Sequence, residues 1–172
     1  MNASVAVMQL LVAAAFLSIP LVRARYGATA MAGAEAELER QGIRTTALTE
    51  NGMRFDAGGH ETWAPVSIAA AMTAVAAVNL FGGSWAEPLT WAFQSIVLAV
   101  NCVILYSNLT AVKSVQAAFL RKDDPALARI DVPALLKAAE DGFPSWVWVL
   151  QNARHVVVFG ASVLALATLF TT

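Results

Sequence analysis

Four long apolar runs divide this sequence, and polar or helix-breaking stretches separate them. Each run approaches or exceeds the roughly 20 residues that a helix needs to cross about 30 Å of hydrocarbon. None of the runs contains an acidic residue. The pattern predicts an all-α integral membrane protein that forms a single four-span membrane domain over residues 1–172. The predicted transmembrane helices cover residues 3–22, 63–81, 89–112 and 146–170.

The connections between the predicted spans differ in length and character. The connection at 82–88 is short and contains Gly82, Gly83 and Pro88, which break helices, so the second and third spans should form an antiparallel hairpin. The other two connections, residues 23–62 and 113–145, are longer. We expect them to form a small cap on one side of the membrane.

Both long connections contain signals of local structure. Strong helix formers continue beyond the first span to Gly42, so that helix should extend past Pro20. Two β-prone runs flank Asn51-Gly52, a strong turn signal, and predict a β-hairpin at 44–57.

The second long connection should contain a short amphipathic helix at 132–141. Asp131 is suited to its N-cap and Pro133 to its first turn, while Gly142 should end it. Its apolar residues would face the membrane surface or a neighbouring element.

Composition agrees with a membrane location. The chain is 58% hydrophobic and 13% charged, whereas an average soluble domain is roughly a quarter charged. The net charge of −1 gives no reason to expect a nucleic-acid partner. The single cysteine, Cys102, excludes an internal disulfide and a cysteine-based metal cluster.

The basic residues predict the orientation of the chain. All eleven lie between the first and second spans, or between the third span and the early part of the fourth. Basic loops stay in the cytoplasm, so both termini should lie outside and both long connections inside. The first run lacks a basic segment before it, so we expect a retained span and not a signal peptide. The alanine-rich composition suggests a bacterium of high GC content, and hence its inner (plasma) membrane.

Arg154 and His155, in the fourth run, have two interpretations. About sixteen residues separate Arg154 from Phe170, roughly 24 Å of helix, so Arg154 should lie near the inner boundary and act as an interfacial anchor. Alternatively, Gln151, Arg154 and His155 share one helix face and could contact an anionic lipid, another anion or a partner. Two further candidates for the same basic cluster, at the end of the first span, are Arg23 and Arg25.

Other polar residues within the predicted spans should hold helices together. Asn79, Gln94 and Asn101 are candidates for interhelical hydrogen bonds. No Asp, Glu or Lys lies in mid-membrane, which disfavours transport by this chain alone. His60 and His155 have no third ligand at suitable spacing, so we expect no metal and no other cofactor.

The predicted topology resembles that of the membrane glutathione and eicosanoid transferases, which also have four spans and a basic first cytoplasmic loop. Those proteins typically carry a pattern like Arg-x-x-x-x-x-Asn-x-x-Glu early in the second span. The second span here contains Asn79 but neither the Arg nor the Glu. The resemblance would imply an enzyme that acts on a lipophilic substrate.

These observations lead to three functional hypotheses. The first is an accessory or structural subunit of a larger bacterial membrane complex, in transport or respiration, without catalysis of its own and with membrane lipids and larger membrane subunits as partners. It rests on the missing catalytic residues and on the small-residue face at Ala70, Ala74 and Val78. The second is a membrane enzyme of the transferase type, and the third is a membrane regulator or sensor.

Overall fold

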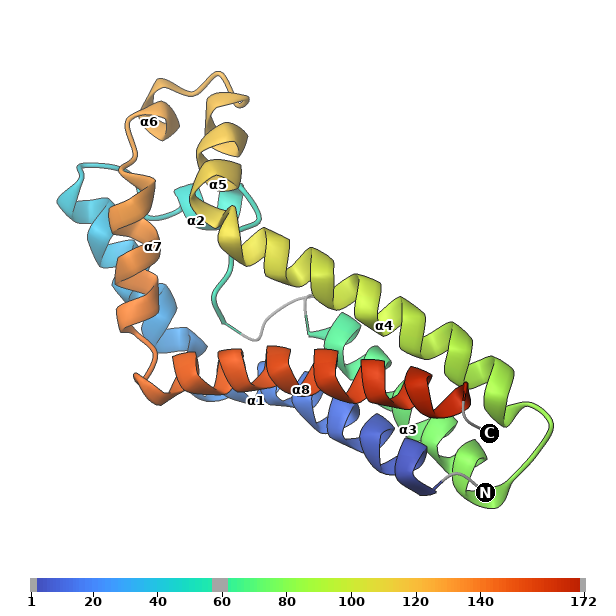
Figure 1. Ribbon diagram of the computed structural model, residues 1–172. Coiled ribbons are helices and arrows are strands. Elements are labelled where there is room, and N and C mark those ends of the chain that lie inside the picture. The colour runs from blue at the N-terminus through green and yellow to red at the C-terminus, as the bar shows by residue number, and fades with distance from the viewer. Residues whose placement is uncertain (1–2, 57–61, 171–172) are drawn as a thin grey trace. The chain divides into compact units, whose positions relative to one another are not determined.

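The computed structural model describes residues 3–56 and 62–170, and no β-strand occurs among them (Figure 1). Four of the helices are long and apolar enough to cross a membrane, which identifies a multi-pass membrane protein. These four are α1 (Ala3–Arg40), α3 (Trp63–Phe81), α4 (Ala86–Leu109) and α8 (Trp146–Leu169). The shorter helices are α2 (Ala47–Glu50), α5 (Ala111–Leu120), α6 (Pro125–Ala128) and α7 (Val132–Asp141).

The chain divides into two compact units. The first, here called the bundle, consists of Met1–Leu21, Gly59–Leu105 and Trp148–Thr172. The second, here called the charged unit, consists of Val22–Gly58 and Tyr106–Val147. The charged unit thus unites the two long connections of the sequence, together with the adjoining ends of α1, α4 and α8.

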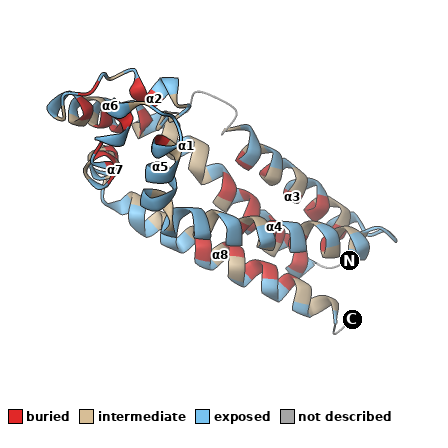
Figure 2. Ribbon diagram, turned by 90° about the horizontal axis from the view of Figure 1, so that it is seen from above, coloured by how far each residue is buried: buried red, intermediate tan, exposed pale blue. Residues whose placement is uncertain are grey.

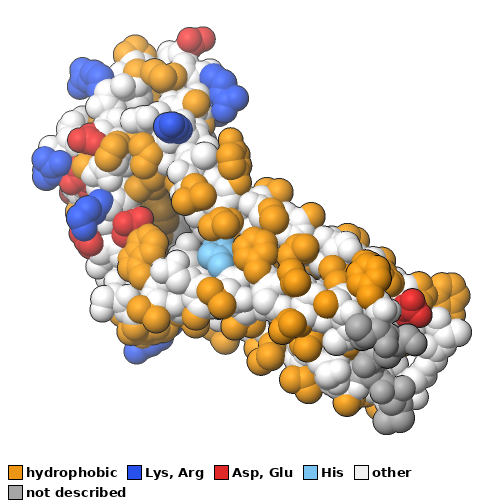
Figure 3. Space-filling model, viewed as in Figure 1, with side chains coloured by type: hydrophobic (Ala, Val, Ile, Leu, Met, Phe, Trp, Pro, Cys, Tyr) orange, Lys and Arg blue, Asp and Glu red, His pale blue; other side chains and the backbone are white. Residues whose placement is uncertain are grey.

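The bundle has a small apolar core and an apolar surface. Val12, Phe16, Met72 and Val158 are buried where α1, α3 and α8 pack together. Buried and exposed positions alternate around each of these helices (Figure 2). Hydrophobic side chains also cover much of its surface in Figure 3, as expected for helices whose solvent is lipid.

The charged unit has a separate core built from short helices. Leu38 of α1, Leu48 of α2, Phe119 of α5 and Leu135 of α7 are buried together there. In Figure 3 most of the visible Lys, Arg, Asp and Glu side chains gather on the surface of this unit. A buried apolar centre with a charged exterior is the pattern of a water-facing domain.

The predicted helix at 132–141 is confirmed as α7. The Oδ1 atom of Asp131 accepts a hydrogen bond from the backbone N–H of Ala134 at 3.1 Å, so Asp131 caps the helix. Gly142 is its C-cap residue. Leu135 and Ala139 point into the core of the charged unit, so the apolar face meets the protein's own helices.

The predicted β-hairpin at 44–57 is wrong over its described residues, 44–56, while residue 57 lies outside the described part of the chain. Ala47–Glu50 form α2 instead, and Asn51-Gly52 ends this helix. The N–H of Met53 bonds to the carbonyl of Leu48 at 2.9 Å, and the N–H of Gly52 to that of Thr49 at 3.1 Å. This pair of bonds is the Schellman motif, which requires a left-handed residue, and Gly52 supplies it with φ of 69°.

The long first helix ends in the same way. The N–H of Ile43 bonds to the carbonyl of Leu38, and the N–H of Gly42 to that of Glu39, both at 2.9 Å. Gly42 has φ of 71°, and α1 continues past Pro20 as the sequence predicts. The third predicted span, 89–112, is shifted: α4 ends at Leu109, and α5 begins after Thr110.

Candidate functional site: buried polar contacts in the bundle

A first group of buried polar side chains joins α1, α3 and α4. The amide nitrogen of Asn79 donates to Thr90 Oγ1 at 2.8 Å and to Gln9 Oε1 at 3.2 Å. The Gln9 amide nitrogen donates to Thr90 Oγ1 at 3.2 Å, and the Thr90 hydroxyl donates to the carbonyl of Ala86 at 2.7 Å. All three side chains are buried. The group connects three helices through hydrogen bonds made inside the bundle.

A second group joins α4 to α8 through two pairs of buried residues. The amide nitrogen of Gln94 donates to Ser162 Oγ at 3.2 Å, and Asn101 Oδ1 lies 3.2 Å from His155 Nδ1. Gln94 and Asn101 are seven residues apart on α4, and His155 and Ser162 are seven apart on α8. Seven residues are nearly two helical turns, so each helix presents both of its polar residues on one stripe. We call these residues the α4–α8 polar pairs.

The hydrogen bonds assign a tautomer to His155. Arg154 Nη2 lies 3.4 Å from His155 Nε2, and a guanidinium has donors only. Nε2 must therefore accept, and the ring proton lies on Nδ1, from where it is donated to Asn101 Oδ1. The imidazole is neutral in this arrangement, and both of its nitrogens are used.

Three buried atoms around the α4–α8 polar pairs have no hydrogen-bond partner. Two are donors, Asn101 Nδ2 and Arg154 Nε, and one is an acceptor, Gln94 Oε1. Asn101 is 1% exposed and Gln94 is fully buried. Native proteins rarely leave such groups unpaired, so the two donors beside His155 distinguish this location from the satisfied Gln9–Asn79–Thr90 group.

The other residues proposed for the basic cluster are distributed over both units. Gln151 is half-buried on α8, in the bundle with Arg154 and His155. Arg23 and Arg25 belong to the charged unit.

Each of these two arginines has a contact within that unit. The Arg23 guanidinium donates to the backbone carbonyl of Arg54. The Arg25 guanidinium lies 5.8 Å from the ring centroid of Tyr26, a cation–π contact. The same Tyr26 ring packs edge-on against Trp146.

Metal coordination has no support among residues 3–56 and 62–170, where no three His, Cys, Asp or Glu side chains could hold an ion. His60, the other histidine considered for such a site, lies outside the described residues. Cys102 is exposed on α4.

Ser162 and Thr90 are partners that sequence reasoning did not single out, since serine and threonine are common in apolar helices. The sequence nevertheless contained a signal for Ser162. Gln94 and Asn101 repeat at seven residues, and so do His155 and Ser162. Two polar repeats of equal spacing on different spans indicate helices that pair along their length.

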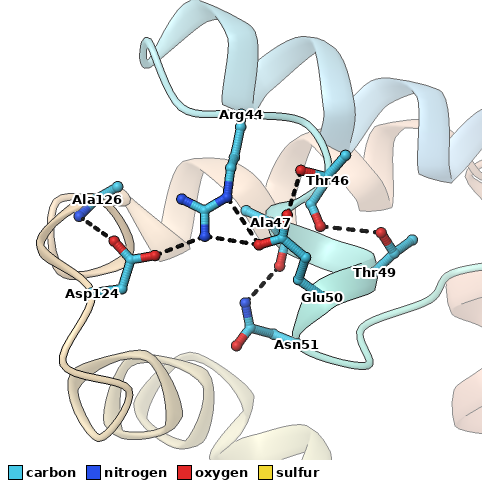
Figure 4. A network of polar contacts seen from close by, with 8 residues as sticks. All are labelled: Arg44, Thr46, Ala47, Thr49, Glu50, Asn51, Asp124 and Ala126. Atoms are coloured by element: carbon cyan, nitrogen blue, oxygen red, sulfur yellow. Dashed lines mark hydrogen bonds and ion pairs between the residues drawn. The ribbon is translucent and has the colours of Figure 1, made fainter.

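The charged unit contains a polar network of its own, drawn in Figure 4. Arg44 donates from Nε to Glu50 Oε2 at 2.9 Å and from Nη2 to Asp124 Oδ2 at 2.7 Å. Thr46 also donates to Glu50, and the N–H of Ala126 donates to Asp124. The network connects the segment after α1 to the start of α6.

These hydrogen bonds shift the acid–base equilibria of the network. Arg44, followed by the Ala126 N–H, lowers the pKa of Asp124, and Arg44, followed by Thr46, lowers the pKa of Glu50. The stability gained is complete above the ordinary carboxylate pKa values and is lost as the pH falls through the lowered ones. All three side chains are solvent-accessible, so the network contributes only a small stabilisation of the local arrangement.

Comparisons of the chain with protein-family models, with curated proteins and with solved structures return no match.

Proposed function

We propose that this protein is an accessory subunit of a larger bacterial membrane complex, such as a transport or respiratory assembly, with no catalysis of its own. The observation that carries the proposal is the outward face of α3. Between Trp63 and Leu80, every exposed residue of this helix is Ala, Ser or Thr. The set consists of Ala64, Ser67, Ala70, Thr73 and Ala74.

This face is free of the protein's own side chains because α3 packs through its other side. Ala69, Met72 and Asn79 point inward and are buried. The bundle portion of α1 differs from α3, since its exposed residues include the large side chains of Leu10 and Leu17. Bulky aliphatic residues suit lipid chains, whereas small residues let the backbone of another helix approach closely. The occupant proposed for the α3 face is a transmembrane helix of a larger membrane protein.

The proposed orientation places both termini outside and the charged unit in the cytoplasm of a bacterial inner membrane. The support is the distribution of basic residues between the units. Ten of the eleven Lys and Arg residues belong to the charged unit, and Arg154 is the exception. The positive-inside rule then assigns the charged unit to the cytoplasmic side.

Mild-detergent purification with quantitative mass spectrometry tests the α3 face. The variant Ala70→Leu/Ala74→Leu thickens the small-residue face. Its control is Ala92→Leu/Ala99→Leu, which adds the same bulk at two exposed alanines of α4. We expect the wild type and the control to retain one larger membrane protein in a fixed ratio. The α3 variant should lose it by about tenfold, because steric bulk at a helix contact costs about 1–3 kcal/mol.

Other results would contradict the proposed function or favour one of the two alternative hypotheses. If the wild type and both variants retained the larger membrane protein equally, the α3 face would not be its binding surface. A chain that purifies alone as a homotrimer with a bound thiol cofactor would favour the transferase hypothesis instead. Retention of a soluble protein alone would favour the regulator hypothesis.

A further inference from the structure

Two hydrogen-bond donors remain unused on either side of His155. Asn101 offers its amide N–H groups, because its oxygen already accepts from His155. Arg154 offers Nε–H, because its Nη2 is directed at the histidine. Both nitrogens of His155 are occupied, so the ring itself has nothing further to offer. The group that completes this arrangement must be an acceptor.

The positive charge of Arg154 indicates that this acceptor is an anion. Arg154 is the one Lys or Arg of the bundle, and it forms no salt bridge with the described carboxylates. Within the described bundle the one acidic side chain is Glu87, at the start of α4. It precedes Asn101 by fourteen residues, about 21 Å along the helix. A half-buried guanidinium without a counter-ion is costly, so a negative charge should come from outside the chain.

The position of Arg154 along α8 indicates the source of that charge. Fifteen residues separate it from Leu169, about 22 Å of helix, against about 30 Å for the hydrocarbon core. The guanidinium can therefore reach the boundary at which phospholipid phosphates lie. Trp148, six residues before Arg154, is 45% exposed, as expected of an aromatic residue at that boundary.

We propose that Asn101 and Arg154 bind the phosphate of an anionic phospholipid, with His155 positioning the Asn101 amide. Arg–phosphate hydrogen bonds are charge-assisted, and the Asn101 N–H groups add a neutral contact. The site is independent of the α3 face, because lipid binding requires only the purified chain.

Native mass spectrometry of the delipidated, purified full chain tests the proposal with phosphatidylglycerol and phosphatidylcholine of identical acyl chains. The wild type should prefer phosphatidylglycerol by about tenfold, because the choline cation of phosphatidylcholine offsets the phosphate charge that Arg154 would otherwise meet. Arg154→Gln should abolish the preference, and Asn101→Leu should reduce it by about threefold. Two controls should match the wild type: Asn152→Ala, at an exposed neighbour on α8, and Arg25→Gln, which removes one charge from the charged unit.

Three outcomes would overturn the proposal. Equal binding of the two lipids by the wild type excludes a site that selects an anionic phospholipid. Retained preference in Arg154→Gln places the site elsewhere. Displacement of phosphatidylglycerol by millimolar inorganic phosphate assigns the site to free phosphate and not to lipid. Because Arg154→Gln could fold poorly, thermal unfolding of the wild type supplies a second measurement, and phosphatidylglycerol should raise the midpoint relative to phosphatidylcholine.

Discussion

At the scale of residues, hydrogen bonds connect Arg154, His155 and Asn101. The donor-only guanidinium of Arg154 determines which nitrogen of His155 accepts and which one donates. The guanidinium cannot accept, so His155 Nε2 must, and this places the imidazole proton opposite Asn101 Oδ1. Sequence spacing alone could group Gln151, Arg154 and His155 on one face of α8. Sequence reasoning identified Asn101 as a candidate for an interhelical hydrogen bond but did not assign His155 as its partner, because the two lie 54 residues apart and meet only through the pairing of α4 with α8.

The tautomer of His155 is a direct prediction of this arrangement. In protein labelled with ¹⁵N-histidine, the variant His60→Gln leaves His155 as the single signal. At neutral pH we expect the chemical shifts of a neutral ring protonated at Nδ1. The Arg154→Gln variant should shift the signal toward a mixture of tautomers, because Nε2 loses its donor. If the His155 ring is protonated at Nε2 in the protein that carries only His60→Gln, the hydrogen bonds described here are contradicted.

At the scale of elements, helix ends account for the main success and the main error of sequence reasoning. Asp131, Pro133 and Gly142 correctly delimited α7, because each acts within one turn of its own position. Asn51-Gly52 was interpreted as a hairpin turn, since the same dipeptide serves both structures. The distinguishing signal was a repeat: "LERQGI" at 38–43 and "LTENGM" at 48–53 share a leucine, a glycine and a final apolar residue. Both are Schellman ends whose leucines are buried together.

The close packing of α1 against α7 predicts an asymmetry between two helical glycines. A Cβ atom at Gly33 would lie 2.7 Å from the carbonyl oxygen of Ala138, whereas one at Gly160 would meet nothing within 4 Å. Gly33→Ala should therefore destabilise the protein by about 1–3 kcal/mol through overpacking. Gly160→Ala should be neutral or stabilising by about 0.5–1 kcal/mol, because alanine favours the helix. Thermal unfolding of both variants in one detergent measures the difference, and equal midpoints would contradict the contact.

At the scale of the whole molecule, composition and hydropathy predicted the four membrane-length helices because lipid imposes length and apolarity on each span separately. The sequence predicted a cap formed by the two long connections, but it did not predict that this cap would have a core of its own. That core brings together residues that lie far apart in the sequence, such as Leu48, Phe119 and Leu135. No local pattern encodes such pairings, although the concentration of charges in the two connections indicated a water-facing location.

The threading of the chain through the membrane underlies both proposals, and cysteine labelling of intact cells tests it most directly. In a Cys102→Ser background, single cysteines replace Ser84, between α3 and α4, and Gln116, exposed on α5 of the charged unit. We expect a membrane-impermeant maleimide to label Ser84→Cys in intact cells, and to label Gln116→Cys only after the membrane is permeabilised. Labelling of Gln116→Cys from outside, with Ser84→Cys protected, would contradict this threading.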